Sequence, residues 1–92
     1  MEKEEQLVAL GDQSEALLKQ EVFNKTINQL VEGTFQAFVN SKPEETNARE
    51  KAYAHYRALV DIVNTLQQRV SVRDEIINKN KQAEQSDNND EE

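Results

Sequence analysis

Apolar residues recur in the second half of the chain at alternating spacings of four and three. In residues 48–70, AREKAYAHYRALVDIVNTLQQRV, the apolar positions are separated by steps of 4, 3, 4, 3 and 4. This spacing places side chains on one face of a helix. It predicts a long amphipathic helix over residues 47–78, with the recurring positions Ala52, Tyr56, Leu59, Val63, Leu66 and Val70.

An earlier apolar stripe predicts a second long helix over residues 12–39. Asp12 and Glu15 have the spacing of a capping box, in which each side chain satisfies a free amide at a helix start. Gly11 is expected to end a short N-terminal helical segment, residues 1–11, in a left-handed conformation. The apolar stripe of the helix predicted over residues 12–39 contains Phe23, Ile27 and Leu30, flanked by Val31, Phe35 and Phe38.

The segment between the two stripes is polar and contains Pro43, the chain's one proline. Proline disfavours helix at the preceding residue, and Thr46 or Asn47 is expected to cap the next helix. A short connection between two long amphipathic helices predicts an antiparallel hairpin, in which facing residue numbers sum to about 87. The expected fold class is therefore all-α, with residues 12–78 forming a helical hairpin.

Both predicted helices have apolar faces wider than the narrow seam that two paired helices need. A hairpin would leave the flanks of these faces in water, so we expect oligomerisation to complete it into a bundle. The alternative is a monomer whose N-terminal segment folds over the flank. In either case the five aromatic rings are expected to be packed rather than to face water. The predicted interface residues are Phe23, Ile27, Val31, Phe35, Phe38, Tyr53, Tyr56, Val60 and Val63.

The net charge of −7 comes mostly from the C-terminal end of the chain, where five acids lie in the last nine residues. Residues 79–92 are almost without apolar side chains and are expected to form a disordered acidic tail. The remainder is nearly balanced and has no basic stripe, so we expect neither direct nucleic-acid binding nor membrane binding. No apolar run is long enough to cross a bilayer, and the acidic start MEKEEQ does not resemble a signal peptide.

The residues that carry chemistry form no recognisable constellation. There is no cysteine and one histidine, His55, which we interpret as a packed residue at the edge of the apolar face. Arg57 and Asp61 are spaced for a helical ion pair. Arg49 is interpreted as a hinge or capping residue, and Arg73, which interrupts the apolar stripe, as part of a solvated surface. The sequence therefore predicts a non-enzymatic protein without metal or cofactor.

Residues 20–72 resemble a loose family of small tailed-phage proteins that form helical hairpins and are encoded among virion-assembly and packaging genes. The resemblance implies a phage origin, a place in the host cytoplasm with the virion as a second location, and a role as an accessory of virion assembly or genome packaging. A small phage inhibitor that captures a host protein is the alternative. The matching positions are Val22, Phe23, Pro43, Arg49, Glu50, Tyr53 and Leu59.

Overall fold

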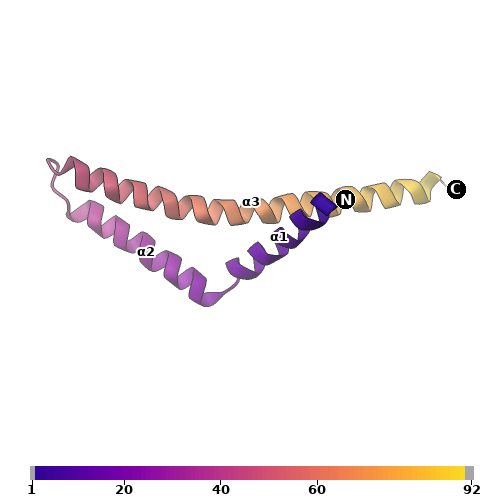
Figure 1. The fold of residues 1–92 in the computed structure, drawn as a ribbon, viewed down its shortest axis with the longest axis horizontal. Helices are drawn as coiled ribbons and strands as arrows, with labels where there is room; N and C mark the ends of the chain where they lie inside the picture. Colours follow the sequence, from indigo (N-terminus) through magenta and orange to yellow (C-terminus); the bar gives the residue numbers. More distant parts are fainter. Residues whose placement is uncertain (1, 91–92) are drawn as a thin grey trace. The chain divides into compact units, whose positions relative to one another are not determined.

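The chain is almost entirely helical in the part that the structure describes. The computed structural model describes residues 2–90, with side chains described for residues 2–84. Three helices follow one another: α1 (Glu2–Leu18), α2 (Glu21–Asn40) and α3 (Thr46–Asp90) (Figure 1). No strand occurs within residues 2–90. The all-α prediction is confirmed.

The helix predicted over residues 12–39 is wrong, because the chain leaves the helical conformation between α1 and α2. Gln20 has extended backbone angles (φ −75°, ψ 125°), and its carbonyl oxygen accepts a hydrogen bond of 3.1 Å from the amide of Asn24. At 100° per residue, the buried positions of α1 and the half-buried positions of α2 lie roughly half a turn out of phase. A break lets each helix turn its own face inward.

Gly11 does not end a helix, contrary to the prediction. It lies inside α1, and no glycine within the described residues has a positive φ. Its lack of a side chain serves a close approach of α1 to α3 instead. A Cβ at Gly11 would lie 2.5 Å from the Cβ of Arg73 and 2.8 Å from the carbonyl oxygen of Arg69. The predicted capping box is also wrong, because Asp12 and Glu15 lie within α1 and bind Arg73.

The predicted break around Pro43 is confirmed, and α3 begins shortly after it. The backbone amide of Lys42 donates a hydrogen bond of 2.8 Å to Oε1 of Glu45. Glu45 directly precedes the first residue of α3, so it stands at the capping position that was predicted for Thr46 or Asn47. Its carbonyl oxygen already accepts the first bond of the helix.

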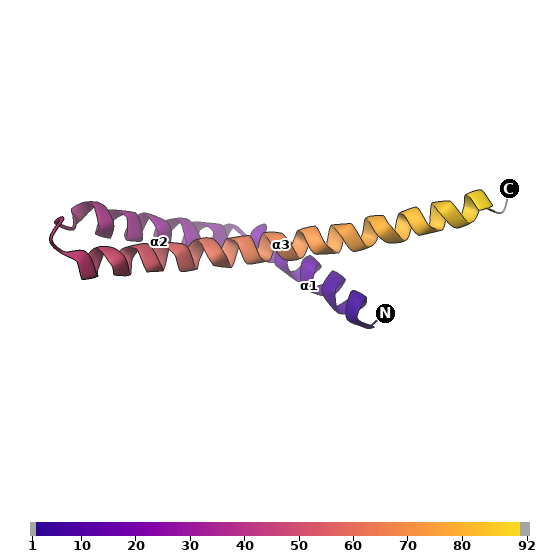
Figure 2. The same ribbon diagram turned by 90° about the horizontal axis from the view of Figure 1, so that it is seen from above.

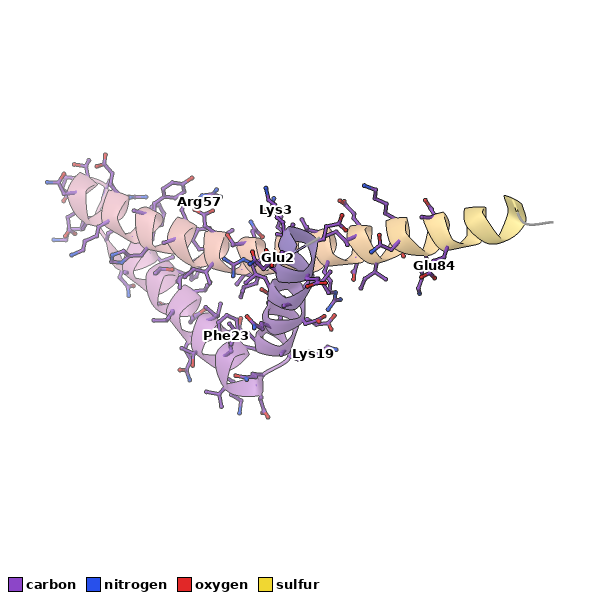
Figure 3. All side chains as sticks on the ribbon, turned by 45° about the vertical axis from the view of Figure 1, so that its right-hand side comes forward. Glu2, Lys3, Lys19, Phe23, Arg57 and Glu84 are labelled. Atoms are coloured by element: carbon purple, nitrogen blue, oxygen red, sulfur yellow. The ribbon has the colours of Figure 1, made fainter. Side chains whose placement is uncertain are left out.

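α3 continues well past its predicted end at residue 78. The segment 79–90, predicted to be disordered, is helical, and residues 91–92 lie outside the described part. Residues 79–84 are rich in helix-forming lysine, glutamine, alanine and glutamate, which favour helix without any burial. Figure 3 shows the described side chains of α3, with Arg57 in its first part and Glu84 at the end of the described side chains.

The chain divides into two compact units, and α3 contributes to both. Of the described residues, unit 1 combines 2–16 with 66–90, and unit 2 is Leu17–Thr65. In unit 2, α2 lies alongside the first part of α3 (Figure 2). Its seam contains Ala52, which is 6% exposed, and half-buried aliphatic and aromatic side chains from both helices: Phe23, Ile27, Val31, Leu59, Val60 and Val63.

Candidate functional site

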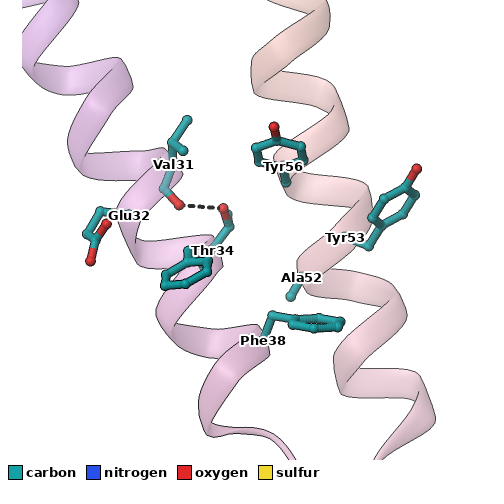
Figure 4. Close-up of a pocket in the computed structure, with 8 residues that line it drawn as sticks. Val31, Glu32, Thr34, Phe38, Ala52, Tyr53 and Tyr56 are labelled. Carbon is teal, nitrogen blue, oxygen red and sulfur yellow. Dashed lines mark hydrogen bonds between the residues drawn. The ribbon is translucent and has the colours of Figure 1, made fainter.

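An open apolar groove runs between α2 and the first part of α3. Its volume is about 580 Å³, and small Ala52 lies among its lining residues. Figure 4 shows Phe38 reaching from α2 towards α3, with Tyr53 and Tyr56 on the opposite helix. Six residues provide most of its lining: Val31, Thr34, Phe35, Phe38, Tyr53 and Tyr56.

Four aromatic side chains of this groove face water. Phe35 is 56% exposed and Tyr53 is 61% exposed, while Phe38 and Tyr56 are 40% and 41% exposed. The prediction that the aromatic rings are packed in the chain is therefore wrong for these four, and Phe23 alone is half-buried. Two paired helices share one seam, so residues at the flank of the apolar face have no third element to cover them.

Two polar side chains of the groove, those of Thr34 and Glu32, form hydrogen bonds within their own helix. The hydroxyl of Thr34 donates a hydrogen bond of 2.8 Å to the carbonyl oxygen of Val31, marked in Figure 4. Oε1 of Glu32 accepts a bond of 3.0 Å from Nε2 of Gln36. The groove therefore presents mainly apolar surface to a binding partner.

Arg49 lies over the ring of Phe38, with its guanidinium carbon 4.4 Å from the ring centroid. A cation over an aromatic face is attracted by the quadrupole of the ring. This contact places the first turn of α3 against the last turns of α2, as expected from facing numbers that sum to about 87. Arg49 thus shields part of Phe38, a contact that differs from the predicted hinge or capping role.

The nine predicted interface residues fall into two groups in unit 2. Phe23, Ile27, Val31, Val60 and Val63 are half-buried, whereas the other four are the exposed aromatic residues of the groove. Five of the nine line the groove. Their role as an interface between chains stays a prediction.

A second notable cluster lies in unit 1 and was not predicted. Arg73 is 9% exposed, which contradicts its interpretation as a solvated residue. Its NH1 atom lies 2.9 Å from Oδ1 of Asp12, and its NH2 atom lies 3.0 Å from Oε2 of Glu15 and 2.9 Å from Oδ1 of Asp74. These bonds, with Glu15 contributing most, raise the pKa of Arg73 above its usual value. We call Arg73, Asp12, Glu15 and Asp74 the arginine cluster.

The remaining candidate groups do not assemble into a reactive site. His55 is exposed rather than packed. No group of three or more histidine, cysteine or acidic side chains within the described residues is arranged to hold a metal ion. The predicted ion pair between Arg57 and Asp61 is present, at 3.6 Å, on an exposed surface. None of the helices in the described part combines the length and apolar character needed to cross a bilayer.

Comparison of the chain with family models, with curated proteins and with solved structures gives no match in any of the three.

Proposed function

We propose that this chain is a non-enzymatic interaction protein that acts through helix–helix association at the groove of unit 2. The observation that carries the proposal is the exposure of four aromatic rings, between 40% and 61%, around one apolar groove. Burial of apolar surface is the main favourable term in protein association. The side chains of Thr34 and Glu32 in the groove are already hydrogen-bonded, which lowers the cost of covering them.

The exposed area matches that of a functional patch. An aromatic side chain has about 200 Å² to bury, so four that are roughly half exposed offer about 400 Å². Patches of about 300–600 Å² are the largest on typical monomers and are often functional. A standard interface buries about 800 Å² on each partner. The partner therefore also covers neighbouring apolar residues such as Val39, which is 55% exposed.

The occupant that we propose is a second copy of the same chain. In this arrangement α2 and the first part of α3 form an antiparallel hairpin, and two hairpins complete a bundle. A two-fold interface sets the same surface against itself, so a charged patch would repel its own copy. The groove avoids this repulsion, because Glu32 is the one charged residue among those lining it.

The biological role that we propose is that of a phage-encoded accessory of virion assembly or genome packaging. The resemblance of residues 20–72 to small tailed-phage proteins supports this role. In it the chain binds itself or a phage structural protein in the host cytoplasm or on the virion, and binds neither nucleic acid directly nor membranes. Mass spectrometry of purified virions tests the second location.

Size-exclusion chromatography with light scattering tests the association. We expect an oligomer at micromolar concentration for the unchanged chain, and a shift to monomer for Phe35→Glu or Tyr53→Glu. Val22→Glu is the matched control: Val22 is 76% exposed and lies roughly half a turn away from Val31 around α2. A stable monomer of the unchanged chain at micromolar concentration would overturn the proposal.

A second candidate function is inhibition of a host protein, favoured by the acidic end of the chain. Acidic segments bind basic partners, including proteins that bind nucleic acid. Deletion of residues 83–92 is then expected to abolish capture of a host protein in a pull-down, while leaving the oligomer intact. Unchanged capture would remove the acidic end from that mechanism.

A further inference from the structure

In unit 1, none of the fully buried residues of α1 is a large apolar one. The buried residues of α1 are Gly11 and Ser14, which is 2% exposed, while Leu7, Val8 and Leu10 are only half-buried. Small residues let two helix backbones approach closely but bury little apolar area themselves. The docking of α1 on α3 therefore combines half-buried apolar side chains with a close approach of the two backbones.

Open surface hollows flank this contact. One of about 110 Å³ lies beside Leu7, Leu10 and Val72, and another of about 280 Å³ lies beside Val8 and Ile76. Apolar side chains that line an open hollow stay partly in contact with water, so they bury only part of their surface.

The arginine cluster, in contrast, is closely bonded. Nitrogen NH1 of Arg73 lies 2.9 Å from Asp12 and 3.2 Å from Oε1 of Glu15, and NH2 lies 3.0 Å from Oε2 of Glu15. Glu15 thus accepts a bidentate pair of hydrogen bonds, the geometry that best suits a guanidinium group. Asp74 of α3 accepts two further bonds, from Nε and NH2. The pairing of α1 with α3 is fixed by this cluster.

Water reaches the acidic side of the cluster. The side chain of Arg73 is 11% exposed, but those of Asp12 and Asp74 are 64% and 54% exposed, and that of Glu15 is 37% exposed. Exposed partners can exchange the arginine for water and dissolved ions, so contacts of this kind are weakened by salt. The cluster is therefore a contact that can open.

We propose that α1 is a detachable cover, held by the arginine cluster, over the apolar stripe in the later part of α3. In the closed state α1 lies against half-buried Val72 and Ile76. Opening the cluster releases α1 and uncovers this stripe as a second surface on which another copy of the chain docks. Only that last consequence rests on the proposed function; the release of α1 does not.

Hydrogen exchange of the full chain tests the cover. A released helix of 17 residues is marginally stable in water, so its amides exchange rapidly. In Arg73→Glu we expect exchange in α1 to become about tenfold faster or more, with α2 unchanged. The double variant Arg73→Glu with Glu15→Arg restores the protection by exchanging the charges. Arg57→Glu, which removes an exposed ion pair of the same helix, leaves α1 unchanged.

Protection of α1 at its original level in Arg73→Glu would overturn the proposal, and so would failure of the charge exchange to restore it. If Arg73→Glu unfolds the whole chain, the milder variant Asp12→Asn with Glu15→Gln decides, since slow exchange in its α1 equally overturns the cover. Light scattering on the same variants then reports the second surface: a larger oligomer than Arg57→Glu gives supports it. An unchanged mass with a released α1 refutes the second surface alone.

Discussion

In unit 2, α2 meets the first part of α3 through aliphatic side chains and aromatic rings, whereas in unit 1 half-buried aliphatic side chains are joined by a buried glycine, a buried serine and a buried arginine. The first contact leaves aromatic rings exposed, and the second leaves carboxylates exposed. The same helix, α3, thus supplies one surface suited to further association and one suited to reversible closure.

Removing the largest buried apolar side chain has the largest expected effect. Leu66→Ala is expected to lower the free energy of unfolding by about 2–5 kcal/mol, because it leaves a cavity in unit 1. Ile62→Ala is the control, since Ile62 is 47% exposed. Urea denaturation followed by circular dichroism measures both. Equal losses would contradict the role of Leu66 as the apolar anchor of unit 1.

The two glycines provide the next test, because substitution by alanine is expected to raise the free energy of unfolding in one unit and to lower it in the other. Gly33→Ala, with nothing within 4 Å of the new Cβ, is expected to stabilise α2 by about 1 kcal/mol. Gly11→Ala gains the same propensity, but overpacking against the backbone of Arg69 costs about 1–3 kcal/mol. Denaturant midpoints of the two variants measure the difference. Stabilisation by both would contradict the close approach of α1.

High salt is expected to produce a smaller difference between the two units, measured as hydrogen exchange in α1 and in α2. Raising sodium chloride from 0.1 to 1 M shortens the screening length from about 10 to about 3 Å. Amides of α1 should then exchange several times faster, while those of α2, whose seam is apolar, do not. Hydrogen exchange followed by mass spectrometry gives both values in one experiment. Equal acceleration in the two helices would show that the pairing of α1 is no more sensitive to salt than that of α2.

Raising the pH from 7 to 9 is expected to leave the protection of α1 from hydrogen exchange unchanged. The pKa of Arg73 is raised by Glu15, Asp74 and Asp12, so stabilisation from this group is fully present below its unfolded value and is lost only above it. Even the unfolded pKa of an arginine lies far above the working range. Exchange in α1 between pH 7 and pH 9 should therefore follow intrinsic rates alone. Selective loss of protection in this window would exclude Arg73 as the holding group.

The sequence was sufficient for the helical fold class and singled out five of the residues that line the unit 2 groove, because four-three spacing is a local pattern. Exposure was harder to predict, since the burial of Phe35 or Tyr53 depends on a third element that the pattern does not specify. The break between α1 and α2 was harder to predict, because the half-turn offset involves Gly11 and Ser14, the buried residues of α1, which are not part of an apolar pattern.

The roles of Gly11 and Arg73 depend on residues about sixty positions away. Local rules favoured a helix end for the glycine and a solvated position for the arginine, because each rule sees only neighbouring residues. The available signal was the place of Arg73 on an otherwise apolar stripe. A charge at such a position indicates an opposite charge on another element.

The chain contains no cysteine, and every residue from Ile77 to Glu84 is exposed. A single thiol introduced at Lys79 or Lys81 would therefore be unique and accessible, and would disturb no packed contact. A dye or a spin label attached there leaves both helix pairings untouched. The later part of α3 thereby offers a chemical handle from which the movement of α1 can be followed in real time.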